Sequence, residues 1–212
     1  LIEGLRAKGF AGVTRMNNDI KSWYTPWTVY TFQEGSGEYI PSQGFAQGQG
    51  RQRTLRESFW KFDELLLNAT MYYSKILGDN HSISSFVGIE QSTSNQRNFW
   101  AERRGFPTDD HPELFAGSDD GQQSYGESQE WGRLNYFGSF SYDFKKKYFI
   151  DLTIRHDGSS NFGPGKRFGT FPSVAGSWAI HQESFMENIG WLNALKLRAS
   201  WAKMGNDRIA PF

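Results

Sequence analysis

LNYFGSFSYDFKKKYFIDLTIR, residues 134–155, alternates apolar and polar side chains on both sides of a short basic turn. In the first arm, most even positions from Leu134 to Phe144 are apolar, whereas most odd positions are polar. The same alternation resumes after the three lysines of the turn and continues to Arg155. Successive side chains of a strand leave opposite faces, so this period of two predicts a β-hairpin. Each arm has about the length of a tilted membrane-spanning strand.

The same period predicts five further strands, which brings the total to seven. They are expected at residues 5–13, 62–76, 81–91, 168–180 and 195–204. Between them, residues 16–57 and 92–130 lack periodicity and are predicted to be long loops, whereas Gly78-Asp79-Asn80 is typical of a tight turn. Long and short connections alternate along this order. An up-and-down antiparallel sheet would therefore place all its long loops on one side, which in an outer-membrane barrel is the extracellular side.

The composition of the chain agrees with an all-β protein. Its 212 residues include 23 Gly, 18 Phe and 8 Trp, and aromatic residues make up 17%; abundant aromatics and glycines favour strands and turns. The formal net charge is zero, so no overall field attracts nucleic acid, and the absence of Cys excludes disulfides and thiolate metal sites. The sequence contains no run of 18 apolar residues, so it predicts no transmembrane helix. A mean hydropathy of −0.64 is still compatible with a barrel wall, in which only every second residue needs to be apolar.

The pattern leaves two environments open for the apolar side of the strands. In a soluble β-sandwich that side would pack under a second sheet, whereas in a wide barrel it would meet lipid. Strand length and the aromatic residues near strand ends, such as Tyr148 and Trp178, favour lipid. A second layer over Tyr136, Ile150 and Leu197 would exclude the membrane interpretation.

Several blocks in the second half are similar to the SusC/RagA family of TonB-linked outer-membrane proteins. The blocks are KYFIDLTIRHDGSSNFG at 147–163, RFGTFPSVAGSW at 167–178, ESFM at 183–186 and WLNALKLRASW at 191–201. Their order matches that of the family. Two positions depart from its pattern, because His156 stands where a second Arg is usual and Ser184 where Pro is usual. The first half of the chain resembles the family only in layout.

The resemblance implies that residues 1–212 form one partial barrel domain, about seven strands of a TonB-dependent receptor barrel of roughly 22 strands. The chain starts at Leu1 without an initiator Met and stops in mid-pattern, so we expect a piece of a longer protein, with neither plug domain nor signal peptide in this piece. The implied function is import of glycan fragments or peptides across the outer membrane, with a SusD-like surface lipoprotein and energy from the TonB complex. The alternatives are a siderophore-type TonB receptor barrel and a soluble, lectin-like β-sandwich at the cell surface.

Two groups of side chains are candidates for contact with solute or partner. The aromatic candidates are Trp23, Tyr24, Trp27, Tyr30, Phe99 and Trp100. Flat rings in loops can stack on sugars or anchor a lipoprotein lid, although packing of loop on loop is the alternative. The charged candidates, expected to face an aqueous lumen, are Asp151, Arg155, Lys196 and Arg198. The basic members could line a route for solute or instead pair with Asp151 and Asp143.

Other motifs predict no catalytic, cofactor or metal site. Residues 157–166 are rich in Gly but lack the spacing of a phosphate loop, so they are expected to form a turn. The acidic residues between 109 and 120 lack the spacing of an EF-hand, and the four His are scattered. An enzyme is therefore not expected.

Overall fold

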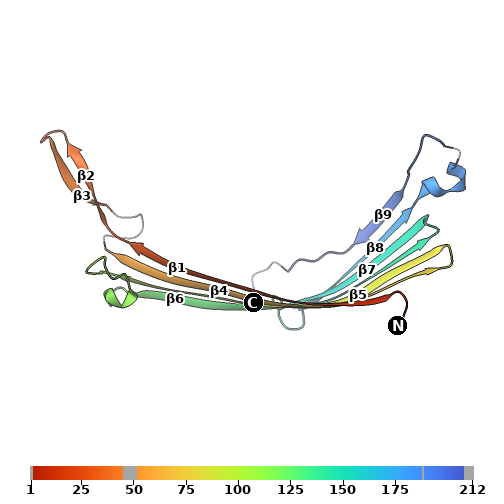
Figure 1. Cartoon of the computed structure of the whole chain (residues 1–212), viewed down its shortest axis with the longest axis horizontal. Helices are drawn as coiled ribbons and strands as arrows, with labels where there is room; N and C mark the ends of the chain where they lie inside the picture. Colours follow the sequence, from red (N-terminus) through yellow and green to blue (C-terminus); the bar gives the residue numbers. More distant parts are fainter. Residues whose placement is uncertain (1, 45–51, 188, 208–212) are drawn as a thin grey trace. The chain divides into compact units, whose positions relative to one another are not determined.

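The computed structural model describes residues 2–44, 52–187 and 189–207. Seven strands form one antiparallel sheet in the order β1-β4-β5-β6-β7-β8-β9, and β2 and β3 form a separate hairpin (Figure 1). The strands are β1 (Leu5–Tyr24), β2 (Trp27–Gln33), β3 (Glu38–Gly44), β4 (Thr54–Leu77), β5 (His81–Arg104), β6 (Gln123–Phe144), β7 (Tyr148–Ser159), β8 (Phe168–Trp178) and β9 (Leu197–Ala202). The 3₁₀ helices are η1 (Leu114–Ala116), η2 (Ile180–Gln182) and η3 (Ser184–Met186). In the described part of the chain, no helix is long and apolar enough to cross a membrane.

The all-β class, the seven strands of the main sheet and their up-and-down order are confirmed, but the predicted loops were too long. β4 and β5 contain 24 residues each, and β1 also reaches far into the segment expected to be a loop. The β2–β3 hairpin lies in that segment as well. Periodicity missed extensions whose two faces do not differ in polarity. For example, every residue from Gln123 to Glu130 in β6 is exposed.

Contacts divide the described residues into two compact units. The first unit draws on residues 1–14, 64–94 and 130–212, and the second on residues 15–63 and 95–129. The first unit therefore holds β7, β8 and β9 together with parts of β1, β4, β5 and β6. The second unit holds the remaining parts of those four strands, the β2–β3 hairpin and η1.

Strand register in the first unit confirms the predicted separation of two faces. Phe140 lies opposite Leu152, Leu152 opposite Val174, and Val174 opposite Trp201, so one apolar row crosses four strands. The neighbouring row on the other side consists of Ser139, Thr153, Ser173 and Ala202. We call the two sides the apolar face and the polar face.

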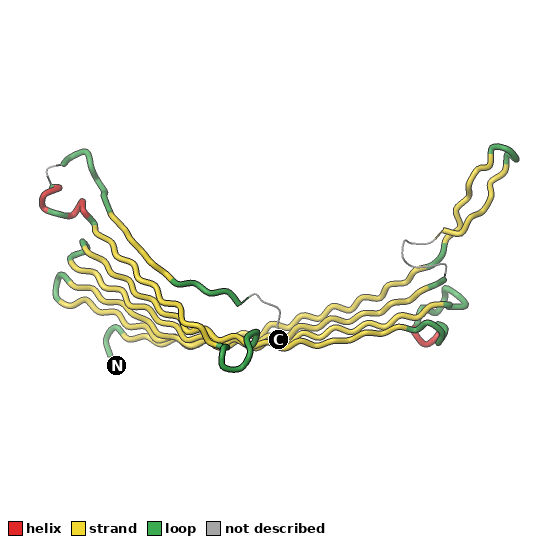
Figure 2. Tube along the Cα trace, turned by 180° about the vertical axis from the view of Figure 1, so that it is seen from behind, coloured by secondary structure: helices red, strands yellow, loops and turns green. Residues whose placement is uncertain are grey.

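The apolar face is uncovered. Tyr136 is 44% exposed, Ile150 48% and Leu197 62%. In the first unit, Figure 1 and Figure 2 show a single layer of strands, with no second sheet among the described residues. Only Leu55, Phe106 and Ala179 are buried hydrophobic residues in the described part of the chain. Because a β-sandwich would cover this face with a second sheet, the arrangement argues against the soluble alternative.

The β6–β7 turn has the geometry that matches the twist of a hairpin. Both central residues, Lys145 and Lys146, have positive φ (53° and 56°), as in a type I′ turn. The backbone N–H of Lys146 donates to the Asp143 carboxylate (3.2 Å), and that of Lys145 donates to the Asn80 carbonyl oxygen (2.6 Å). These bonds stabilise a conformation that lysine rarely adopts.

The β8–β9 connection, residues 179–196, is held against the hairpin by Glu183. Its carboxylate accepts hydrogen bonds from the Tyr148 hydroxyl (2.6 Å) and the Trp178 indole (2.9 Å), and Lys147 Nζ lies 3.0 Å away. These three donors lower the pKa of Glu183 to about 2. The connection is longer than the β7–β8 connection of residues 160–167. The sequence had suggested that long and short connections alternate, but here they do not alternate strictly.

Candidate functional site

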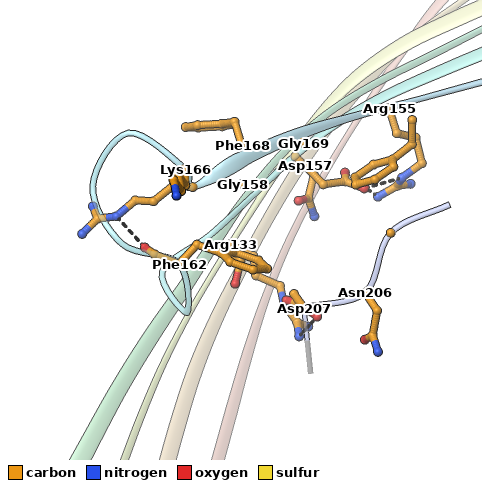
Figure 3. Close-up of a pocket in the computed structure, with 15 residues that line it drawn as sticks. Arg133, Arg155, Asp157, Gly158, Phe162, Lys166, Phe168, Gly169, Asn206 and Asp207 are labelled. Atoms are coloured by element: carbon orange, nitrogen blue, oxygen red, sulfur yellow. Dashed lines mark hydrogen bonds and ion pairs between the residues drawn. The ribbon is translucent and has the colours of Figure 1, made fainter. Parts of the chain in front are cut away.

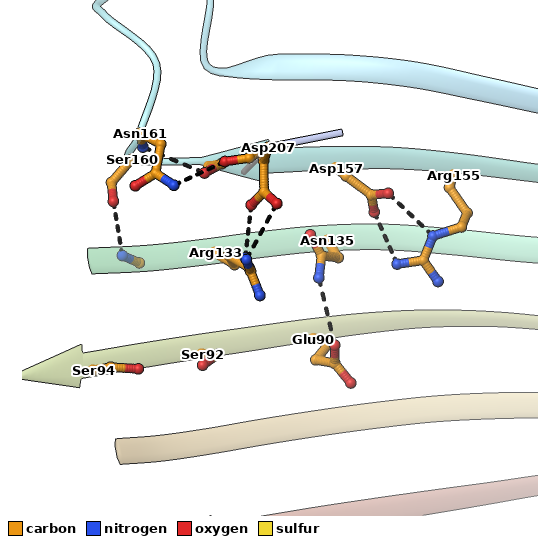
Figure 4. A network of polar contacts seen from close by, with 12 residues as sticks. Glu90, Ser92, Ser94, Arg133, Asn135, Arg155, Asp157, Ser160, Asn161 and Asp207 are labelled. Carbon is orange, nitrogen blue, oxygen red and sulfur yellow. Dashed lines mark hydrogen bonds and ion pairs between the residues drawn. The ribbon is translucent and has the colours of Figure 1, made fainter. Parts of the chain in front are cut away.

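The polar face of the first unit carries a network of hydrogen bonds that crosses several strands (Figure 4). Glu90 accepts hydrogen bonds from the side-chain amides of Asn68 (3.0 Å) and Asn135 (3.4 Å). On β6 and β7, the Ser141 hydroxyl donates to Asp151 (2.6 Å). Such donors offset the cost of removing a carboxylate from water. Glu90 and Asp151 are thus hydrogen-bonded to other side chains of the polar face.

The register places Asp151, Arg155 and Arg198 on this polar face. Asp151 lies opposite Ser141, and Arg198 lies opposite Ser177. Lys196 Nζ lies 3.7 Å from the centre of the Phe149 ring, a cation–π contact. Whether this face lines an aqueous lumen stays a prediction.

Arg155 forms an ion pair, but not with the predicted carboxylates. Its Nε and Nη2 lie 3.1 and 3.0 Å from the two carboxylate oxygens of Asp157, rather than near Asp151 or Asp143. Residues two apart on a strand share a face, which brings these two side chains together along β7. The guanidinium also lies 5.5 Å from the centre of the Phe137 ring. Arg155 thus pairs with a carboxylate, as one of the two alternatives for the basic residues expected, but its partner is Asp157.

A pocket of about 350 Å³ opens at the end of β7 and the start of β8 (Figure 3). Side chains from β6, β7, the 160–167 turn, β8 and the segment after β9 line it. Its charged lining residues are Arg133, Arg155, Asp157, Lys166, Arg167 and Asp207. We call it the β7–β8 pocket.

The segment after β9 closes one side of the β7–β8 pocket. The backbone N–H of Lys203 donates to the Pro172 carbonyl oxygen (3.0 Å). Further along, Asp207 accepts two hydrogen bonds from Arg133, at 2.8 and 3.2 Å, and its carbonyl oxygen accepts one from the Asn161 amide (3.0 Å). Two parallel bonds between a guanidinium and a carboxylate fix the orientation of both groups. A residue that is 74 positions from Arg133 in the sequence is therefore held beside it.

The lining of the β7–β8 pocket has more positive than negative charge. Its four cationic residues face two carboxylates, those of Asp157 and Asp207. Within the described residues, neither Lys166 nor Arg167 forms an ion pair with a carboxylate; Arg167 Nε instead donates to the Phe162 carbonyl oxygen (3.4 Å). The pocket can therefore attract an anionic group.

Sequence reasoning did not identify this pocket. Residues 160–167 do connect β7 to β8, as the predicted turn implied, although β7 continues to Ser159. The prediction gave no role to Arg133, Lys166, Arg167 or Asp207. The adjacent cations Lys166 and Arg167 were a local signal, but the contact of Asp207 with Arg133 joins residues 74 positions apart, which no local spacing reveals.

The aromatic candidates lie in the second unit, all of them on strands rather than in loops. Trp23 and Tyr24 end β1, Trp27 and Tyr30 belong to β2, and Phe99 and Trp100 belong to β5. The Trp23 ring packs edge-to-face on Phe106 (4.8 Å between ring centres), and the Arg56 guanidinium lies 4.0 Å from the centre of the Trp100 ring. By contrast, Trp27, Phe99 and Tyr30 are 47%, 45% and 64% exposed, so they can reach a partner. Contact with ligand or lid stays a prediction.

Replacing Trp23 by Ala is expected to loosen the second unit rather than to weaken ligand binding. The edge-to-face pair with buried Phe106 contributes about 0.5–1.5 kcal/mol beyond simple burial. Hydrogen exchange should therefore become faster in residues 102–106, whereas Tyr30→Ala, at an exposed ring, should leave exchange there unchanged. Unchanged exchange in Trp23→Ala would contradict a packing role for Trp23.

Several known proteins are similar to the chain. TonB-dependent receptor P39 of Formosa agariphila is 32% identical over 170 residues, which cover 77% of the chain and 15% of the receptor. TonB-dependent receptor SusC of Bacteroides thetaiotaomicron is 41% identical over 76 residues, 36% of the chain and 8% of SusC. The structure of the RagAB peptide transporter matches the whole chain with a TM-score of 0.83 and 25% identity, over 22% of the matched chain. No protein-family profile matches. The chain thus spans only about a seventh of the first of these receptors.

Proposed function

Because the chain belongs to the SusC/RagA family of TonB-dependent receptors, we propose that it forms part of the wall of an outer-membrane importer. The uncovered apolar face carries this proposal. A sheet that leaves Ile150, Leu152 and Leu197 about half exposed needs an apolar solvent on that side, and acyl chains provide one. The polar face then borders the path of the solute.

The proposed cargo is a glycan fragment or a peptide. The likeness to SusC and to a peptide transporter supports this class of solute over a metal chelate. A SusD-like lipoprotein at the cell surface would deliver the cargo, and the TonB complex would supply energy through parts of the receptor outside residues 1–212. The exposed aromatic residues Trp27, Tyr30 and Phe99 are the proposed contacts for cargo or lipoprotein.

The full-length receptor provides the test of this proposal. A barrel extracted in detergent should migrate faster on a gel before heating than after heating, and it should precipitate when the detergent is removed. A strain that lacks the receptor should lose growth on the glycan or peptide that it imports, and affinity purification of the receptor should recover a surface lipoprotein. A full-length protein that is monodisperse without detergent would instead support the soluble β-sandwich.

A further inference from the structure

We infer that the β7–β8 pocket binds a carboxylate group of the imported solute; this inference rests on the proposed import function. The pocket lies on the polar face, which in the proposed importer borders the solute path. All its lining residues belong to the first unit. Its volume of about 350 Å³ is at the small end of the range for ligand sites, enough for a sugar ring or an amino-acid residue.

The charge balance of the pocket favours an anionic group. Four cations and two carboxylates leave an excess of two positive charges before any ligand enters. A carboxylate would reduce that excess through ion pairs with these cations. A neutral solute would leave Lys166 and Arg167 without a counterion among the described residues.

The geometry of the guanidinium groups also suits a carboxylate. Arg133 and Arg155 each use Nε and one terminal nitrogen on an internal carboxylate. A guanidinium carries five N–H donors in a fixed plane, so each can still offer donors to a second acceptor. The internal pairs hold both groups at the pocket, which reduces the entropy lost when a ligand binds.

Aromatic rings supply an apolar surface beside these charges. Phe162 and Phe171 line the pocket, and Gly205, which has no side chain, leaves room for the Phe171 ring. An apolar wall next to cationic donors can hold the flat side of a sugar ring or an apolar side chain while its carboxylate pairs. A uronic acid residue of a glycan and the C-terminal residue of a peptide can both present a carboxylate next to an apolar surface.

The test compares matched ligands on the full-length receptor in detergent by isothermal titration calorimetry. One pair of probes is a tetrapeptide with a free C-terminus and the same peptide as its amide; the other is tetragalacturonate and neutral tetragalactose. The acid of at least one pair is expected to bind about tenfold or more tightly than its neutral counterpart, because hydrogen bonds between charged groups are the strong ones. The pair that shows the difference identifies the source of the carboxylate.

The variant for this test is Lys166→Gln with Arg167→Gln, which removes the cations that lack a carboxylate partner. We expect about tenfold weaker binding of the acid and unchanged binding of the neutral probe. Lys145→Gln with Lys146→Gln removes two charges from the opposite end of β7 and should change neither. Equal affinity for acid and neutral probes, or no binding of either acid, would overturn the inference.

A second measurement separates this inference from the proposed function. Heat-modifiable gel mobility and detergent dependence report the barrel, and we expect the double variant to retain both. If the variant binds the acid as tightly as the wild type but unfolds at a lower temperature, the two cations stabilise the receptor and the inference is wrong. If the wild type itself shows neither barrel property, the proposed function fails first.

Discussion

Replacing Leu152 by Arg is expected to prevent the full-length receptor from folding in a bilayer or to destabilise it severely. Leu152 lies on the apolar face, opposite Phe140 on one side and Val174 on the other, and it is 44% exposed. In the proposed importer this face meets acyl chains, where an arginine at the middle of the bilayer costs about 2–4 kcal/mol. Urea unfolding in lipid vesicles, followed by tryptophan fluorescence, measures the loss.

The next residue provides the control. Thr153→Arg places the same charge on the polar face, between Ser139 and Ser173, where the proposed surroundings are aqueous. It should change the free energy of unfolding much less than Leu152→Arg does. If the two variants are equally unstable, or if Thr153→Arg is the worse one, the assignment of lipid to the apolar face is wrong.

Replacing Glu183 by Gln is expected to weaken the end of the sheet at neutral pH and to remove an acid-sensitive step. The carboxylate has a pKa of about 2 in the folded protein against an ordinary value of 4.5, mainly because of hydrogen bonds from Tyr148 and Trp178 and then Lys147. A lowered pKa means that the unfolded chain binds the proton more readily than the folded one. The stability that Glu183 contributes is therefore complete above pH 4.5 and is lost as the pH falls toward 2.

Thermal unfolding of the full-length receptor at several pH values tests this expectation. The wild type should lose more stability than Glu183→Gln between pH 4.5 and 2, and the variant should already melt lower at neutral pH. Glu187→Gln is the matched control, because Glu187 belongs to the same connection and is exposed. A Glu183→Gln variant that keeps the acid dependence of the wild type would show that Glu183 does not stabilise the connection.

Alternation predicted a strand only where the two faces of that strand differ. The hairpin around Lys145 to Lys147 is confirmed in place and in register, because each arm has one apolar and one polar side. Alternation did not predict the strand from Gln123 to Glu130, because both of its faces are exposed and polar residues occur on each of them. Backbone hydrogen bonds continue through such a segment whatever its side chains, so composition does not reveal it.

The candidate site, too, was predicted from the sequence only in part. Sequence alternation assigned Asp151, Arg155 and Arg198 to the polar face, and the register confirms that assignment. It did not predict that Arg155 pairs with Asp157, although the two are neighbours on one face. Among the aromatic candidates, Tyr30 is exposed whereas the Trp23 ring packs on Phe106, a difference that the sequence did not predict because aromatic content alone does not tell packing from contact.

The sequence alone determined the all-β class, the number and order of the strands in the main sheet, and which side chains share a face. These features follow from local periodicity and from turn residues, so each can be read within about ten residues of chain. Only the tertiary structure decided that no second layer covers Ile150 and Leu197, and that Asp207 returns to Arg133 to close a basic pocket. Both depend on residues far apart in the chain, and local pattern contains no information about which distant segments meet.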